Sequence, residues 1–155
     1  SKSLAIPGER VGYIAVNPSI PNVDLLISGM IFCNRTLGFV NAPSLFQKVI
    51  ADSLDVVVNT DEYKKRRDFL YNHLIELGYS CVKPQGAFYL FPQSLIPDDI
   101  EFAKLALKYN LLVVPGSGFG CPGHFRLAYC VDFNSIKNSI PAFKALAEEI
   151  KGQKK

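Results

Sequence analysis

The feature that most limits how this chain can fold is a run of apolar side chains at helical spacing after Thr60. Leu70, Leu74 and Leu77 follow at intervals of four and three residues, and Gly78 comes directly after them. Residues three and four apart share one face of a helix, and glycine commonly ends one. The run therefore predicts a long amphipathic helix, with Thr60 as its N-cap, whose apolar stripe needs other elements to pack against.

The sequence after Gly78 alternates between strand and helix patterns. These patterns first predict a hairpin of strands 79–82 and 87–91, joined by a Pro-Gln-Gly turn, and then a helix that begins at Asp98 or Asp99 and ends at Asn110. Two further strands, 111–114 and 125–130, are expected on either side of a flexible loop at 115–120. A helix over residues 135–150 is expected to close the chain. We therefore expect residues 56–155 to form one α/β unit, of the α+β kind, in which helices pack on a small sheet.

Residues 1–55 have a different character. Val11 to Val16 is an apolar, β-branched run closed by Asn17 and Pro18, which predicts a buried strand. Two helices are expected after it, one starting near Asn22 and stopped by Gly38, the other covering about residues 43–52. We therefore expect residues 1–55 to be the end of a larger domain, and residues 56–155 to be a separate small domain.

The distribution of charge does not favour a nucleic-acid partner. The formal net charge is +3, and the basic side chains gather at residues 64–67 and in the lysine-rich tail. Neither cluster is interleaved with aromatic side chains that could stack on bases, so both are better explained as solvated surface.

The cysteines and the apolar runs limit the class of protein further. Cys33, Cys81, Cys121 and Cys130 form no Cys-x-x-Cys pair, which argues against zinc or another metal site. They are expected to be reduced thiols, most of them in the core, of a cytoplasmic protein. The apolar runs are too short to cross a bilayer, and no signal peptide is apparent, so we expect no membrane association.

Three motifs resemble one known family. The first opens the chain one residue before a lysine, and two others follow in matching order: Gly86 to Leu90, and Pro115 to Gly120 with Arg126 behind it. The positions that match in the first motif are Lys2, Ala5, Ile6, Gly8, Arg10, Val11 and Gly12. Together they resemble the C-terminal portion of class I and II, fold type I, pyridoxal-phosphate-dependent aminotransferases similar to aspartate aminotransferase.

The resemblance implies a role for three residues. Lys2 would hold pyridoxal 5′-phosphate as a Schiff base and then serve as the acid–base catalyst. Arg10 would pair with the cofactor phosphate, and Arg126 would clamp the substrate carboxylate, because a planar guanidinium suits both anions. Through Arg126 the site would select amino acids and 2-oxo acids.

Each of these residues also has an ordinary explanation. Lys2 alone would be a solvated terminus, and Arg10 and Arg126 could be surface ion-pair partners. Arg126, however, lies in an otherwise apolar strand, where a charge needs a partner or a ligand. His73 and His124 are expected to be structural or solvated, because no paired carboxylate or cysteine is evident beside them.

The family's other cofactor contacts precede the attachment lysine. They include the aspartate on the pyridine nitrogen, so this chain alone is expected to be inactive. The parent protein would be a homodimeric aminotransferase. A carbon–sulfur lyase or an aminocarboxylate synthase on the same scaffold, or a non-catalytic module that binds a ligand or partner, remain alternatives. The identity of the amino donor is left open.

Overall fold

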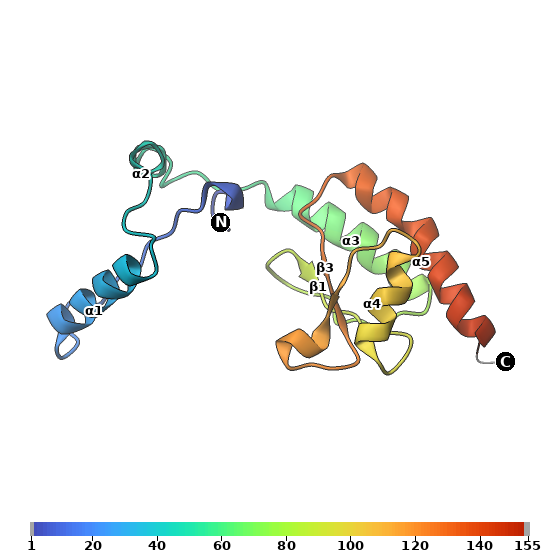
Figure 1. Ribbon diagram of the computed structural model, residues 1–155. Helices are drawn as coiled ribbons and strands as arrows, with labels where there is room; N and C mark the ends of the chain where they lie inside the picture. Colours follow the sequence, from blue (N-terminus) through green and yellow to red (C-terminus); the bar gives the residue numbers. More distant parts are fainter. Residues whose placement is uncertain (1, 154–155) are drawn as a thin grey trace. The chain divides into compact units, whose positions relative to one another are not determined.

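The computed structural model describes residues 2–153 and divides into two compact units, which are described separately. The first unit ends at Val58 and the second begins at Asn59. Along the chain the elements, most of which are labelled in Figure 1, are η1 (Pro7–Glu9), α1 (Val23–Thr36), α2 (Ser44–Ala51), α3 (Thr60–Glu76), β1 (Tyr89–Leu90), α4 (Asp99–Leu107), β2 (Val114–Pro115), η2 (Gly116–Phe119), β3 (Phe125–Ala128) and α5 (Phe133–Gln153).

A three-stranded antiparallel sheet forms the centre of the second unit. Its order is β1-β3-β2, so β3 lies in the middle. Leu90 is opposite Leu127 on one side of β3, and Val114 is opposite Arg126 on the other. Helices α3 and α5 pack on each other, and α4 packs on β2 and α5 (Figure 1). This confirms the expected arrangement of helices on a small sheet.

The core of the second unit is aromatic and aliphatic. The ring of Tyr79 meets those of Phe102, Phe125 and Phe143 edge to face, at centroid distances of 6.4, 5.9 and 5.8 Å. The Tyr79 hydroxyl donates a hydrogen bond to the carbonyl oxygen of Phe143 at 3.2 Å, which satisfies its polar end. Burial raises the pKa of this phenol well above its usual range. The core therefore joins α4, α5 and β3.

The predicted helices of this unit are confirmed, with small changes at their ends. The N-cap of α3 is Asn59 rather than Thr60, because the Asn59 side chain accepts from the amides of Asp61 and Glu62. Gly78 takes a φ of 94° after the helix, a conformation that glycine adopts without a side-chain clash. Asp98 is the N-cap of α4, and the closing helix begins earlier than expected, at Phe133.

The predicted hairpin of 79–82 with 87–91 is wrong. Residues 79–82 form no strand, and β1 pairs with β3 instead. Side chains of α3 hold the intervening segment: Arg67 donates to the carbonyl oxygen of Pro84 at 3.0 Å, and Asp68 pairs with Lys83 at 2.9 Å. These tertiary contacts replace the strand pairing that the local pattern suggested.

Strand 111–114 is also shorter than predicted, and only Val114 of that run is in β2. The amide of Leu111 donates to the carbonyl oxygen of Ala106 at 3.1 Å and so closes the end of α4. Asn110 supports this closure with a φ of 58°. Leu111 therefore belongs to the end of α4, and the strand begins only at Val114.

The first unit has no buried side chain among residues 2–58. The predicted strand 11–16 is wrong for this chain: it is irregular, and Tyr13 and Ile14 are 87% and 75% exposed. A strand needs a neighbour to satisfy its backbone groups, and the described residues of this unit provide none. The two predicted helices are confirmed as α1 and α2.

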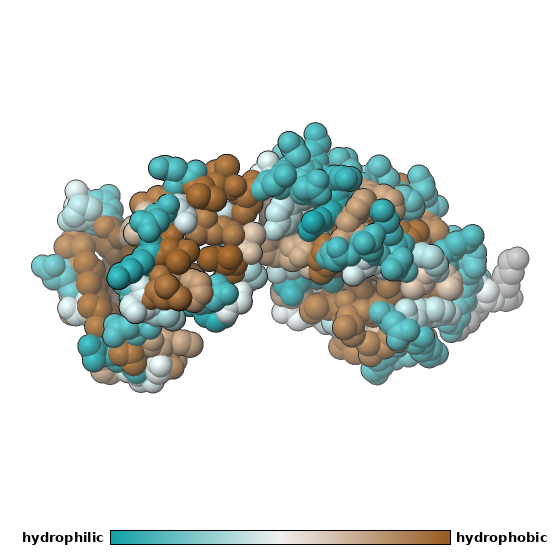
Figure 2. All heavy atoms as spheres, turned by 90° about the horizontal axis from the view of Figure 1, so that it is seen from above, coloured by the Kyte–Doolittle hydropathy of each residue, from teal (hydrophilic) through white to brown (hydrophobic). Residues whose placement is uncertain are grey.

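Large apolar side chains cover much of this unit's surface (Figure 2). They are Tyr13, Ile14, Leu25, Leu26, Ile27, Ile31, Phe32, Leu37, Phe39, Val40, Leu45, Val49, Leu54, Val56 and Val57. Soluble proteins seldom expose so many large apolar side chains unless the surface contacts another part of the protein or a partner.

All four cysteines are free thiols, but the expectation that most lie in the core is wrong. Cys33 and Cys130 are exposed, and Cys81 and Cys121 are half-buried. Within residues 2–153, no helix combines the length and the apolarity that a membrane crossing requires.

The packing of α5 generates a stability prediction. Leu146 on α5 is fully buried, so Leu146→Ala should lower the free energy of unfolding by about 2–5 kcal/mol. Leu107 at the end of α4 is 54% exposed, so Leu107→Ala should change it by about 0.5 kcal/mol or less. Urea unfolding followed by circular dichroism measures both. Equal losses in the two variants would contradict this description of the core.

Candidate functional site

Arg126 is held on the outer face of β3 against two aromatic rings. Phe125 and Leu127 point into the core, so Arg126 points to the opposite face of the strand. Its guanidinium carbon lies 4.6 Å from the ring centroid of Tyr89 and 4.4 Å from that of Phe119. Rings on a guanidinium attract its charge and restrict its orientation. Its N–H edge is the part suited to a planar anion.

Within the described residues, no carboxylate forms a salt bridge with Arg126. The side chain is only half-exposed, so its charge is partly removed from water without an acidic neighbour to offset the cost. This disfavours the explanation of Arg126 as a surface ion-pair partner. A guanidinium in these surroundings favours a carboxylate ligand, which can accept two parallel hydrogen bonds.

Phe119 reaches Arg126 from a loop that a buried carboxylate anchors. The loop begins with η2, and its amides at Ser117 and Gly123 donate to the Asp99 carboxylate at 2.7 and 3.3 Å. Asp99 is 4% exposed. Hydrogen bonds from these amides, that of Ser117 above all, hold the pKa of the Asp99 carboxyl below its usual range. The carboxylate is therefore the form that holds the loop.

The sequence did not identify Asp99 as part of this site. It identified Asp98 or Asp99 only as a helix start, and Asp98 performs that task by accepting from the amides of Ile100 and Glu101. The adjacent pair carried no signal for this role, because acidic residues are common in the first turn of a helix, where they interact favourably with its dipole.

His124 takes part in the same aromatic cluster. Its ring stacks on Phe91 at 5.8 Å with an interplanar angle of 11°, and Phe91 meets Phe119 edge to face at 6.1 Å. Its Nδ1 lies 3.1 Å from the carbonyl oxygen of Pro122 and 3.4 Å from the sulfur of Cys121. The expectation of no cysteine beside it is therefore wrong, whereas its contacts are those of a structural residue.

Lys2 and Arg10 both belong to the first unit and are exposed. Arg10 follows η1 with a φ of 54°, and its guanidinium donates to the carbonyl oxygen of Pro7 at 2.7 Å. Ala5 has a φ of 52° on the other side of η1. Such values cost non-glycine residues about 1–3 kcal/mol and cluster at functional sites. The segment from Ala5 to Arg10 thus has a left-handed residue on each side of η1.

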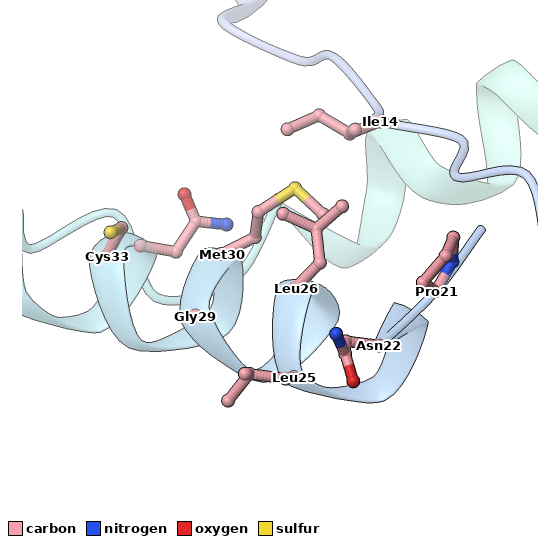
Figure 3. A pocket seen from close by; sticks show the side chains of 9 residues that line it. Ile14, Pro21, Asn22, Leu25, Leu26, Gly29, Met30 and Cys33 are labelled. Atoms are coloured by element: carbon pink, nitrogen blue, oxygen red, sulfur yellow. The ribbon is translucent and has the colours of Figure 1, made fainter.

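The amine and the guanidinium suit a phosphorylated aldehyde, because one group can bond the aldehyde carbon and the other can pair with the phosphate. Both can be reached from solvent. One hollow of the first unit lies beside α1: Figure 3 shows Leu26 and Met30 on the side of the helix that faces Ile14, and neither Lys2 nor Arg10 lines this hollow. Residues 2–153 contain no group of three His, Cys, Asp or Glu side chains able to hold a metal ion.

Comparison with known proteins points to one family. The family model described as "Aminotransferase class I and II" matches residues 1–142. The aspartate aminotransferase of Bacillus subtilis (strain 168) is 32% identical over 165 residues, covering 96% of this chain and 40% of the relative. The probable aspartate/prephenate aminotransferase of Aquifex aeolicus (strain VF5) is 32% identical over 158 residues, covering 97% and 40%.

A solved structure agrees with these matches. The amino transferase from Eubacterium rectale superposes with a TM-score of 0.83 at 42% identity, over 96% of this chain and 37% of that one. The chain thus spans about two fifths of the length of the curated relatives it matches.

The loop beside Arg126 generates a second stability prediction. A methyl group on Gly116 would collide with the carbonyl oxygen of Cys121 and come within 2.8 Å of that of His124. Hydrogen bonds fix both residues at the base of the loop, because the His124 carbonyl oxygen accepts from the Gly116 amide and the Cys121 amide donates to the Gly116 carbonyl oxygen. Gly116→Ala should therefore destabilise the protein by about 1–3 kcal/mol.

Gly118 provides the matched control, because a methyl group there meets nothing within 4 Å. Gly118→Ala should leave the midpoint of thermal unfolding close to that of the unmodified chain. A Gly116→Ala variant as stable as the Gly118→Ala variant would show that the loop is looser than described.

Proposed function

This chain belongs to the class I and II aminotransferase family, and from that membership we propose that its parent protein is a pyridoxal-phosphate-dependent amino-acid aminotransferase. The helices and small sheet are a portion of the fold type I architecture of these enzymes. The parent would move an amino group from an amino acid to a 2-oxo acid. Relatives named aspartate or aspartate/prephenate aminotransferases support amino-acid and 2-oxo-acid substrates.

The observation that carries the proposal is the position of Arg126. A guanidinium that contacts two aromatic rings and has no salt bridge within the described chain is suited to a carboxylate ligand. Amino acids and 2-oxo acids share a carboxylate next to the reacting carbon. Arg126 would bind this group in a bidentate pair and so orient the Cα–H bond that is broken.

Lys2 and Arg10 would hold the cofactor. Arg10 pairs with its phosphate, and the Lys2 amine attaches it covalently. When bound, pyridoxal phosphate supplies an electron-withdrawing ring next to the reacting carbon. Lys2, once released from the cofactor, carries the proton on its Nζ atom as general base and then general acid. The strained backbone at Ala5 and Arg10 supports a binding role for this loop.

The two units would be parts of two domains. Residues 1–55 belong to the end of the large cofactor-binding domain and residues 56–155 to the small domain, which closes over the substrate and excludes water. The exposed apolar side chains of residues 2–58 support a covering by the rest of the large domain and by a second subunit. This chain alone would be inactive. The free thiols support a cytoplasmic location for the homodimeric parent.

The full-length protein tests the role of Lys2. With pyridoxal phosphate it should show the visible absorbance of covalently held cofactor and convert an amino acid and a 2-oxo acid into the exchanged pair. Lys2→Ala should remove both signals, because no amine remains to hold the cofactor.

Lys48→Ala is the matched control, since Lys48 is an exposed lysine on α2 of the same unit. It should retain both the absorbance and the activity. If the unmodified protein releases sulfide without exchanging amino groups, the carbon–sulfur lyase alternative replaces transamination. If it instead forms a cyclic aminocarboxylate, the aminocarboxylate synthase alternative does.

Substitution of Arg126 tests the carboxylate site. Arg126→Gln should lower kcat/KM for both substrates about 100-fold, because the carboxylate loses its charged fork and its fixed orientation. Lys137→Gln is the control: it also removes a cation over an aromatic ring, 4.6 Å from the centroid of Phe133, but on α5. Its kcat/KM should stay within about twofold. Equal effects of the two variants would refute the assignment.

A further inference from the structure

Asp99 is the only buried charged side chain among the described residues. A buried carboxylate costs free energy unless charges or hydrogen bonds compensate for it. Asp99 forms no salt bridge in the described part of the chain, and it accepts hydrogen bonds from two amides of the loop that follows β2. The Asp99 carboxylate therefore serves to bind that loop.

The start of α4 does not require Asp99. Asp98 already caps the helix through two hydrogen bonds of 2.9 Å, to the amides of Ile100 and Glu101. Asp99 is the first helical residue, and its carboxylate accepts hydrogen bonds from the amides of residues 18 and 24 positions later in the chain. Asp98 thus caps the helix, whereas Asp99 binds the loop.

The two amides bracket Phe119, since Ser117 precedes this residue and Gly123 follows it. Two other hydrogen bonds close the base of the loop: the Gly116 amide donates to the His124 carbonyl oxygen at 2.7 Å, and the Cys121 amide donates to the Gly116 carbonyl oxygen at 3.0 Å. Those bonds fix the loop's own shape. The bonds to Asp99 fix the loop against α4, and hence the place of the Phe119 ring over Arg126.

We propose that Asp99 is a positioning residue for the carboxylate site: it anchors the 116–123 loop to α4 so that Phe119 holds the Arg126 guanidinium in the orientation that binds the substrate carboxylate. This role rests on the proposed function of Arg126. Asp99 does not touch the substrate; it acts through the loop and the Phe119 ring. Its loss should weaken carboxylate binding and leave the proton transfer at Lys2 intact.

Asp99→Asn in the full-length enzyme tests this role. The amide side chain keeps the shape but can accept at only one of its two polar atoms, so one loop amide loses its partner. KM for both the amino acid and the 2-oxo acid should rise about threefold to tenfold, because the weakening of one cation–π contact changes binding affinity by about that factor. The value of kcat should change less than about twofold. Asp98→Asn is the matched control, because it removes the same charge at the same helix start and keeps a good N-cap.

A double-mutant cycle separates positioning from general destabilisation. Phe119→Leu removes the ring over Arg126 and should raise KM in the same way, and the double variant Asp99→Asn/Phe119→Leu should show no further rise, since Asp99 acts through Phe119. Additive rises in KM would overturn the inference. Where Asp99→Asn does not fold, Asp99→Glu takes its place, since it keeps the charge but displaces the acceptor oxygens by one methylene, and a rise in KM is again expected.

The outcomes for Arg126 and Asp99 can be told apart. If Arg126→Gln leaves kcat/KM for both substrates unchanged, the proposed carboxylate site itself fails. If Arg126→Gln lowers kcat/KM while Asp99→Asn, or Asp99→Glu in its place, behaves like Asp98→Asn, only the positioning role of Asp99 is overturned.

Discussion

The contact of the Arg126 guanidinium with the rings of Tyr89 and Phe119 is the interaction on which the proposed function depends. Each partner comes from a different segment: Arg126 from the central strand, Tyr89 from an edge strand and Phe119 from the loop after the other edge strand. The core fixes β3 through Phe125 and Leu127, which alternate with Arg126. Burial of Phe125 and Leu127 on one face thus fixes the position of β3, and the fixed strand orients the Arg126 side chain on the opposite face.

The sequence predicted those elements whose signals are local. Helix α3 is set by its apolar spacing and by Gly78, and the predicted strand around Arg126 appears as β3. The strand predicted at 79–82 does not form, and contacts with a distant helix, such as the hydrogen bond from Arg67 to Pro84, hold the segment that follows it. The strand predicted at 111–114 is shortened because Leu111 bonds to Ala106 at the end of α4. No local propensity contains such contacts.

The candidate site was predictable only in part, for the same reason. A family motif identifies Arg126, but the rings around it follow from strand register and loop position, which place Tyr89 and Phe119 beside it. Asp99 was missed because its partners, Ser117 and Gly123, lie far along the chain. In the first unit the sequence predicted a buried strand at 11–16, yet residues 2–58 have no strand partner and no buried side chain among themselves. A strand depends on neighbours as much as on its own residues.

The central claim is that Lys2 and Arg10 hold the cofactor and that Arg126 binds the substrate carboxylate in the proposed parent enzyme. A crystal structure of the full-length protein with pyridoxal phosphate and an unreactive carboxylate inhibitor tests it most directly. We expect the cofactor to be bonded to the Nζ atom of Lys2, its phosphate to accept hydrogen bonds from Arg10, and the inhibitor carboxylate to accept two from Arg126. A cofactor attached to another residue, or a carboxylate bound away from Arg126, would contradict the account.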